Sequence, residues 1–295
     1  MSFKIFSDTS CNIPMSRLSD AGVDLIPFSY YDKEKIDDVK NCIDIGSFDG
    51  PSFYNSIKQG KVFNTSQITP QIYYDYMEPV AREGTDILYV GMSSGISGSY
   101  NSSLAAQKML EEEYPNVKFY FHDTKAASLG EGIAVFKAIE LREKGYSIEE
   151  TYNYLENMFK NIYQVFTVDD LKSLSRTGRL SNAVAIIGNL LNIKPLLKGN
   201  EFGQIISFDK VRGNKKAIMA LAHKYNELVV HPETQIVGIA HANNPEDTQL
   251  LVDLINEKHP PKEILTVMYE PVTGSHVGPG TVALFFLGDD NVRFN

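Results

Sequence analysis

Short apolar runs alternate with longer helical patterns in the first half of the chain. The runs at residues 4–8, 86–91 and 117–122 are rich in β-branched and aromatic residues, as expected of buried strands. Between and after them, apolar spacing predicts helices over residues 70–82, 99–114 and 130–144. Thr69 and Pro70 fit an N-cap and a first helical position, and Gly84 and Gly145 fit helix ends. This alternation predicts an α/β fold with a largely parallel, doubly wound sheet.

In the second half of the chain, strand-like runs and helical patterns do not alternate regularly. Strand-like runs lie at residues 204–211, 235–240, 264–268 and 281–287, and helical patterns lie at 214–227 and 245–258. We therefore expect an N-terminal α/β domain over residues 1–161 and a C-terminal α+β domain over residues 162–295. Ligands commonly bind between such domains or at the carboxyl ends of parallel strands.

Composition and charge narrow the possible partners. The 295 residues include 28 Lys and Arg against 37 Asp and Glu, a net charge of −9, which disfavours nucleic acid as a partner. No apolar run approaches the roughly 18 residues of a membrane span, so we expect no stable membrane insertion. The first residues do not resemble a signal peptide, and the only cysteines are Cys11 and Cys42. We therefore expect a reduced, cytoplasmic protein.

Sequence motifs favour binding over catalysis. HExxH, CxxC, Walker A and GxGxxG patterns are absent from the sequence, so we expect no metal and no cofactor. No serine has a GxSxG setting and no paired carboxylates with a defined spacing occur, so we expect no catalytic residues.

The serine-rich turn at residues 91–99 is the strongest local signal. It follows a predicted strand and precedes a predicted helix, where backbone amides, hydroxyls and the helix dipole can bind an anion. Ser93 and Ser94 are therefore candidate ligand-binding residues. The alternative is a flexible linker or a serine N-cap, but the position at a strand end argues against a linker.

Three further segments carry candidate binding residues. Thr65 and Ser66 can donate hydroxyls to the same anion, although their segment also reads as a common helix-capping sequence. His276 lies among glycines, which predicts a histidine held by backbone turns rather than within a helix. It fits a proton shuttle, a hydrogen-bond partner or a surface loop residue equally well.

Two arginines form the last candidate group. Arg176 and Arg179 bracket a Thr-Gly pair and precede a predicted apolar helix over residues 182–191. They fit a clamp for a carboxylate or phosphate, although taken alone solvated arginines beside an N-cap at Ser181 are the better interpretation. The nearly continuous apolar sequence at 183–197 fits a core segment or the wall of a hydrophobic tunnel.

Taken in order, these segments resemble the DegV family of bacterial fatty-acid-binding proteins across nearly the whole chain. The resemblance rests on seven motifs, at residues 6–10, 65–67, 93–100, 123–130, the Arg-Leu-Ser turn at 179–181, 194–197 and 274–280. Three positions depart from the family pattern: Ile68 stands where Pro is frequent, Ser99 where Thr is frequent, and Thr177 where Gly is frequent.

The resemblance implies a two-domain, DegV-like fold with a fatty acid between the domains. The ligand carboxylate would be bound by Thr65 and Ser66, by Ser93 and Ser94, and by a network that includes His276 and Arg179. The acyl chain would run into an apolar tunnel in the second domain.

The resemblance also implies a partner. Some members present the bound fatty acid to a fatty acid kinase, whose acyl phosphate product enters phospholipid synthesis, and Arg212 would lie on the docking surface. The chain would then be a carrier rather than an enzyme. The alternative is a phosphoryl or acyl transferase or hydrolase that uses the serine loop for phosphate and His276 as a general base.

Overall fold

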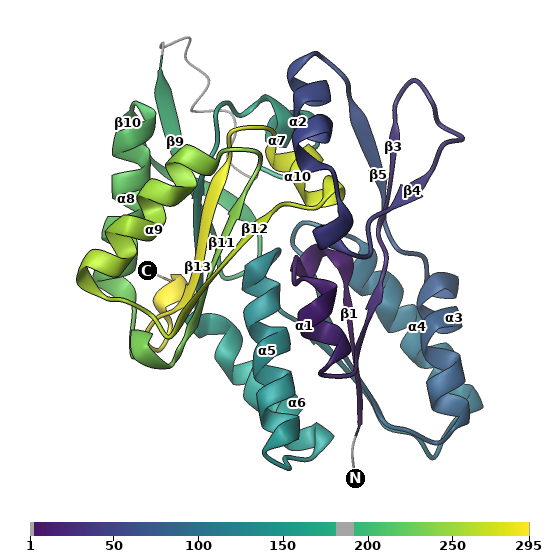
Figure 1. Cartoon of the computed structure of the whole chain (residues 1–295). Helices are drawn as coiled ribbons and strands as arrows, with labels where there is room; N and C mark the ends of the chain where they lie inside the picture. The colour runs from purple at the N-terminus through teal and green to yellow at the C-terminus, as the bar shows by residue number, and fades with distance from the viewer. Residues whose placement is uncertain (1–2, 181–191, 295) are drawn as a thin grey trace. The chain divides into compact units, whose positions relative to one another are not determined.

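The computed structural model describes residues 3–180 and 192–294, which form two compact units. Unit 1 contains Met1–Phe48 and Asn64–Phe159, and unit 2 contains Asp49–Phe63 and Lys160–Asn295. Figure 1 shows the elements of both units. The division of the sequence into domains at 1–161 and 162–295 stays a prediction. The predicted apolar helix at 182–191 and the predicted N-cap Ser181 lie outside the described residues.

Unit 1 is built on a four-stranded parallel sheet of order β2-β1-β6-β7. A second, three-stranded sheet has the order β4-β3-β5. The strands are β1 (Lys4–Asp8), β2 (Val23–Ile26), β3 (Ser29–Asp32), β4 (Lys40–Asn41), β5 (Phe63–Ser66), β6 (Ile87–Gly91) and β7 (Phe119–Asp123). The helices are α1 (Met15–Ser19), α3 (Pro70–Arg82), α4 (Ser99–Glu113), α5 (Leu129–Glu143) and α6 (Ile148–Met158). The short 3-10 turns are η1 (Thr9–Cys11) and η2 (Ile45–Ser47).

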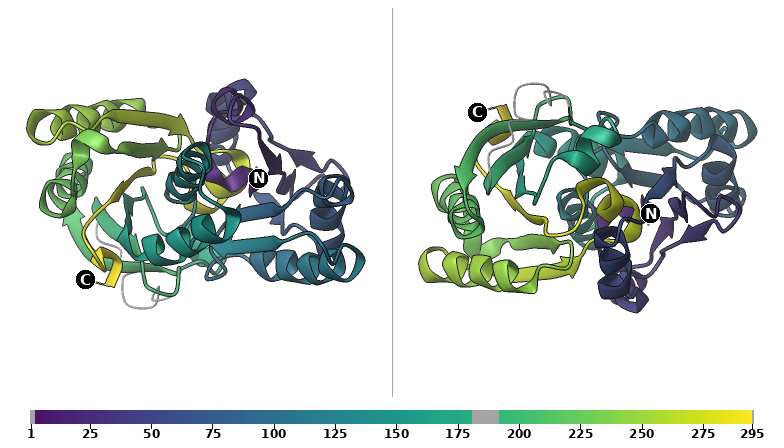
Figure 2. Two further views of the ribbon diagram at one scale, coloured as in Figure 1. Left: turned by 90° about the horizontal axis from the view of Figure 1, so that it is seen from below. Right: turned by 90° about the horizontal axis from the view of Figure 1, so that it is seen from above.

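The parallel sheet of unit 1 is covered on both faces. Helices α3 and α4 pack against each other on one face, and α1, α5 and α6 lie on the other (Figures 1 and 2). All five residues of β6 are buried, which explains why its sequence is continuously apolar rather than alternating. The predicted parallel, doubly wound sheet is therefore confirmed.

Local sequence signals account for the helix ends in unit 1. The side chain of Thr69 accepts a hydrogen bond from the backbone N–H of Ile72 and caps α3, and Pro70 is its first residue. Gly84 follows the end of this helix with φ of 76°, a conformation that glycine adopts without strain. The hairpin of β3 and β4 and the helices α1 and α6 were not predicted, because their apolar patterns are short or weak.

Unit 2 is built on a six-stranded mixed sheet of order β10-β9-β8-β13-β11-β12. Only β11 and β12 are parallel neighbours, and the other pairs are antiparallel. The strands are β8 (Ile162–Thr167), β9 (Ile193–Gly199), β10 (Ile205–Arg212), β11 (Ile236–His241), β12 (Glu263–Met268) and β13 (Val282–Leu287). The helices are α2 (Gly50–Lys58), α7 (Lys172–Arg176), α8 (Asn214–Leu228), α9 (Pro245–Lys258) and α10 (Pro271–Val277). The 3-10 turns are η3 (Phe159–Asn161), η5 (Pro232–Thr234) and η6 (Val292–Phe294).

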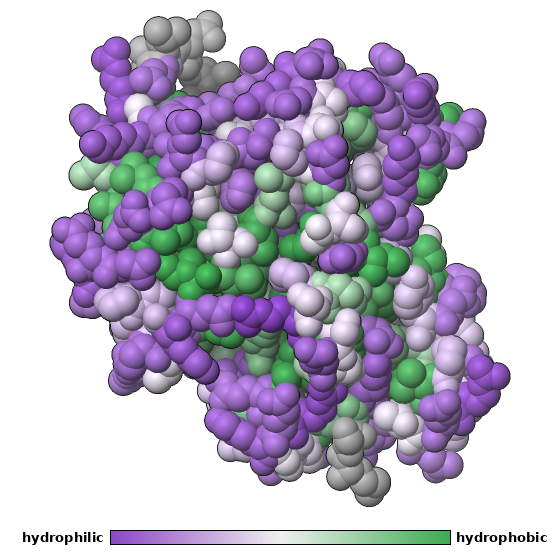
Figure 3. Space-filling model, in the orientation of Figure 1, coloured by the Kyte–Doolittle hydropathy of each residue, from purple (hydrophilic) through white to green (hydrophobic). Residues whose placement is uncertain are grey.

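The core of unit 2 lies between this sheet and the helices α8 and α9 (Figure 2). Ile218 and Leu221 of α8 pack with Leu284 and Phe286 of the central strand β13, and all four are almost fully buried. Over α8 and α9, at the left of Figure 3, hydrophobic residues show among hydrophilic ones, as expected of helices with one face on a core. The predicted α+β character of this half is confirmed.

Candidate functional site

The serine loop follows β6 in unit 1, where the sequence predicted it. Ser93 is fully buried: its N–H donates to the carbonyl of Ala126 at 2.8 Å, and its Oγ accepts from Gly95 N at 3.0 Å. Ser94 is partly exposed, and its N–H donates to Oδ1 of Asp123 at 3.1 Å. The loop is therefore a fixed turn rather than a flexible linker. Helix α4 begins directly after it, at Ser99.

The turn after the neighbouring strand β7 supports this loop. Nζ of Lys125 lies 2.9 Å from Oγ of Ser94 and 2.6 Å from Oδ2 of Asp123. Lys125 and Ser128 both have positive φ, 52° and 54°, which is unusual for residues other than glycine. Such backbone strain tends to occur at functional sites. Asp123 and Lys125 belong to the motif at residues 123–130, but the sequence predicted no binding role for either, although Asp123 ends and Lys125 follows a strand that is parallel to β6.

Thr65 and Ser66 also belong to unit 1, at the end of β5. Thr65 is partly buried and Ser66 is exposed. The segment that follows them meets the end of the serine loop, because the N–H of Ile68 donates to Oγ of Ser99 at 3.1 Å. The side-chain oxygen of Gln67 lies close to the backbone of Gly98, so a side chain at that position would have to displace it. The two predicted hydroxyl-bearing segments are therefore brought together within unit 1.

His276 belongs to unit 2 and lies in helix α10, so the prediction of a histidine held outside a helix was wrong. The side chain of Glu270 accepts from the N–H groups of Val272 and Thr273, and Pro271 is the first residue of the helix. These capping signals outweigh the helix-breaking tendency of Gly274. Gly274 is required because a side chain there would collide with Tyr54 of α2.

Arg179 and Arg176 lie near His276 in unit 2. Burial and, to a smaller extent, the positive charges of Arg179 and Arg176 together lower the pKa of His276 to about 4. His276 is therefore neutral at pH 7. Arg176 ends the helix α7, which was not predicted, and α7 packs against α10. Arg179 donates to the carbonyl of Thr177, and burial lowers its pKa.

A pair of carboxyl groups is buried in unit 1, although no defined spacing in the sequence predicted one. Oγ of Ser10 lies 2.5 Å from Oδ1 of Asp8 and 2.5 Å from Oε2 of Glu131. Both acidic residues are fully buried. Their separation along the chain hid the pair, because no local spacing links the end of β1 to the first turn of α5.

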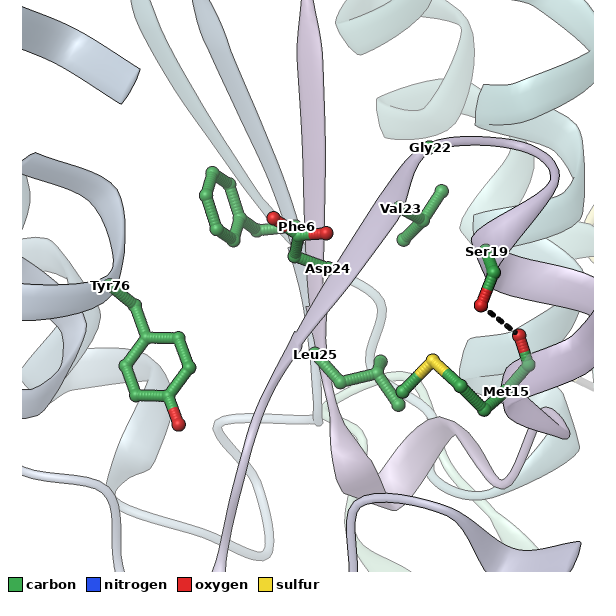
Figure 4. Close-up of a pocket in the computed structure, with 8 residues that line it drawn as sticks. All are labelled: Phe6, Met15, Ser19, Gly22, Val23, Asp24, Leu25 and Tyr76. Carbon is green, nitrogen blue, oxygen red and sulfur yellow. Dashed lines mark hydrogen bonds between the residues drawn. The ribbon is translucent and has the colours of Figure 1, made fainter. Parts of the chain in front are cut away.

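A separate hollow of about 440 Å³ lies beside β2, the edge strand of the parallel sheet (Figure 4). Its lining consists of Phe6, Met15, Ser19, Gly22, Val23, Asp24, Leu25 and Tyr76. None of the side chains predicted to bind an anion takes part in it.

In residues 3–180 and 192–294, which the structure describes, no group of three or more His, Cys, Asp or Glu side chains is arranged to bind a metal ion. Within the same ranges, no helix has the length and apolar character needed to cross a membrane.

Comparison with known proteins identifies relatives over nearly the whole chain. A DegV domain-containing protein of Clostridium perfringens is 38% identical over 288 residues, covering 97% of this chain and 98% of the relative. Another from Staphylococcus aureus is 31% identical over 291 residues, covering 98% of each.

Solved structures show the same fold. A DegV lipid-binding protein of Thermotoga maritima has a TM-score of 0.85 and 28% identity, with 98% of this chain and 99% of that chain covered. DegV of Bacillus subtilis, described as a fatty-acid-binding protein, has a TM-score of 0.83 and 28% identity, with 98% and 100% covered. The family model described as "Uncharacterised protein, DegV family" matches residues 2–289. The chain therefore belongs to the DegV family.

Proposed function

We propose that this chain binds a long-chain fatty acid. The single observation that carries the proposal is the fixed serine loop of unit 1, in which Lys125 donates to the hydroxyl of Ser94. The DegV proteins of Thermotoga maritima and Bacillus subtilis, described as lipid-binding and fatty-acid-binding, support the ligand class.

In this proposal the carboxylate is bound by the hydroxyls of Thr65, Ser66, Ser93 and Ser94, with His276 and Arg179 in the same hydrogen-bond network. Because Oγ of Ser94 accepts from Lys125, its own proton can be donated to the ligand. The Lys125 ammonium places a positive charge next to that hydroxyl, which favours an anionic head group.

The acyl chain supplies most of the affinity in this account. A chain of about 15 methylenes gains ~12 kcal/mol on full burial, at ~0.8 kcal/mol for each methylene. The cost of association reduces this gain by several kcal/mol, which leaves micromolar to nanomolar binding. The head group then needs only enough polar partners to compensate for the loss of water around a buried carboxylate. The acyl chain would occupy the apolar tunnel implied by the family resemblance.

We further propose that the bound acid is presented to a fatty acid kinase in the cytoplasm, so that the chain is an accessory carrier rather than the enzyme. Arg212, exposed at the end of β10, is the proposed contact for that kinase. The enzymatic alternative gains no support from His276, because a general base works best with a pKa near the working pH and the pKa of His276 is about 4.

Native mass spectrometry tests the proposed ligand. Protein purified from a bacterial host should carry an added mass equal to a long-chain fatty acid, and delipidated protein should regain that mass when offered palmitic or oleic acid. Delipidated protein that stays empty with these acids, yet hydrolyses a phosphate ester on its own, would reject the carrier in favour of the enzyme.

A further inference from the structure

Two buried carboxyl groups lie beneath the serine loop of unit 1. Asp8 ends β1 and Glu131 lies in the first turn of α5, and the side chains of both are fully buried. Within residues 3–180 and 192–294, no Lys, Arg or His forms an ion pair or hydrogen bond with either carboxyl group. Two full negative charges would therefore be buried side by side without a cation, which is strongly unfavourable.

The protons available around the pair are too few for two ionised carboxylates. Ser10 has a single hydroxyl proton, yet its Oγ lies 2.5 Å from an oxygen of Asp8 and 2.5 Å from an oxygen of Glu131. Both distances are typical of strong hydrogen bonds, and each needs one proton. Ser10 can supply only one of them, so the other must come from a carboxylic acid.

Ser7 does not supply the missing proton. Its Oγ lies 2.8 Å from the carbonyl oxygen of Val90 and 3.0 Å from Oε1 of Glu131. A carbonyl cannot donate, so the Ser7 proton is directed to Val90. Glu131 therefore receives at most a shared proton from Ser7, and its own acidic proton stays available for Ser10.

The other neighbours decide which carboxyl group is the acid. Asp8 accepts from Ser10 N at 2.9 Å, from Tyr89 OH at 2.8 Å and from Met92 N at 3.1 Å. Three donors of this kind stabilise an ionised carboxylate. The carboxyl group of Glu131, in contrast, has as its hydrogen-bond partners among the described residues the hydroxyls of Ser7 and Ser10 and the side chain of Asp8.

We infer that Glu131 is a neutral carboxylic acid at pH 7, which donates to Ser10 Oγ, and that Ser10 donates in turn to an ionised Asp8. This chain of hydrogen bonds ends at the backbone N–H of Met92, the residue before Ser93. Asp8 and Glu131 are therefore positioning residues for the serine loop. Their part in ligand binding rests on the proposed function, whereas the protonation of Glu131 does not.

The pKa directions agree with this assignment. Burial raises the pKa of Glu131 well above its usual value, and the negative charge of Asp8 raises it further. The pKa of Asp8 is also raised, because burial outweighs the hydrogen bonds from Ser10, Met92 and Tyr89, but these bonds oppose the rise and favour the ionised form of Asp8. The other titratable groups that face the pair are neutral, because burial raises the pKa of Cys11, Tyr73 and Tyr89 well above their usual values.

The arrangement leaves one negative charge rather than two behind an anion site. A second ionised carboxylate would repel the ligand's carboxylate and would also repel Asp8. The proton on Glu131 removes one of the two negative charges, whereas the ionised Asp8 still holds the serine loop through Met92 N–H. The loop can therefore be rigid and still bind an anion.

Infrared spectroscopy on the full chain tests the protonation directly. A neutral carboxylic acid has a carbonyl stretch that is separated from the absorption of ionised carboxylates. We expect one such band at pH 7, and we expect labelling of glutamate with ¹³C at the side-chain carboxyl to shift it. Absence of the band, or a band unmoved by glutamate labelling, would overturn the inference without reliance on any variant.

Variants then connect the acid to the loop. Glu131→Gln should abolish the band, while Glu140→Gln, a partly exposed position on the same helix, should leave it unchanged. Asp8→Asn should lower the affinity for palmitic acid at least tenfold, because it removes the charged acceptor of Met92 N–H. An unchanged affinity would refute the positioning role. If wild-type protein shows the band but does not bind palmitic acid, the proposed function fails and the protonation of Glu131 stands.

Discussion

Nζ of Lys125 lies 2.9 Å from Oγ of Ser94, and the two residues come from turns that follow neighbouring parallel strands. Asp123 fixes both partners, because it accepts from Ser94 N at 3.1 Å and from Lys125 Nζ at 2.6 Å. The ammonium group is thus held next to the hydroxyl rather than free to rotate into water. This relationship makes Lys125 the described cation most directly tied to the serine loop.

Replacing Lys125 with Met should weaken binding of oleic acid by about 1.5–3 kcal/mol, the usual contribution of a hydrogen bond to a charged group. The apolar stem is kept, so the loss reports the charge and the donor. Isothermal titration calorimetry measures the change. Lys118→Met, at an exposed position directly before β7, is the matched control and should bind oleic acid like wild type. Equal affinities of both variants for oleic acid would show that Lys125 does not contribute to binding.

The stability of unit 2 should depend on the protonation of His276. Its folded-state pKa is about 4, below the roughly 6.5 of an unfolded histidine, so the unfolded chain binds a proton that the folded chain rejects. The stabilisation is present above pH 6.5 and is lost as the pH falls toward 4. The loss reaches on the order of 2–3 kcal/mol at the acid end of this range.

Urea unfolding between pH 7 and pH 4 measures this effect. His276→Gln should flatten the pH dependence, whereas His223→Gln, on an exposed position of α8, should leave it as in wild type. If the stability of the wild type depends on pH no more strongly than that of His276→Gln, the pKa of His276 does not change on folding.

Arg179→Gln should raise the pKa of His276. After burial, the positive charge of Arg179 has the largest lowering effect on that pKa, ahead of the charge of Arg176. NMR titration of the His276 ring protons measures the change. Lys172→Gln, at an exposed position of α7, should not shift the titration. If Arg179→Gln leaves it unmoved as well, the arginine does not act on this histidine.

The buried cap of α10 should contribute more to the free energy of unfolding than an exposed cap does. Glu270 is fully buried and accepts from two backbone N–H groups, so Glu270→Ala leaves both without that partner inside the protein. We expect a cost of about 2–3 kcal/mol. Ser147→Ala removes the exposed capping box of α6, where water can replace the side chain, and should cost about 0.5–1 kcal/mol. Chemical denaturation measures the free energy of unfolding of both variants. A larger loss in Ser147→Ala than in Glu270→Ala would contradict this account.

The sequence predicted the elements whose signals are local. Residues 4–8 and 245–258 have the predicted bounds, because a buried strand and a capped amphipathic helix are each specified by neighbouring residues. Helix α10 was missed because glycines at 274 and 278 suggested turns, whereas the deciding features were the Glu270 cap and the close approach of Tyr54. Tyr54 lies far away along the chain, so no local pattern could reveal that approach.

The candidate site shows the same limit. Ser93 and Ser94 were found from their position after a strand. The motif at residues 123–130 contains Asp123 and Lys125, but their contacts with the serine loop follow only from the parallel pairing of β6 with β7. The Asp8–Glu131 pair was missed for a related reason, because a shared hydroxyl between distant segments leaves no spacing in the sequence.

The most direct test of the central claim compares a fatty acid with the fatty alcohol of the same chain length. Both bury the same tail, so a difference in affinity isolates recognition of the carboxylate by the hydroxyl-bearing loop. Wild-type protein should bind palmitic acid more tightly than hexadecanol. Ser93→Ala and Thr65→Val should each lose about 1–3 kcal/mol for the acid and little for the alcohol. Equal binding of acid and alcohol by wild-type protein, or unchanged acid binding in both variants, would contradict the account.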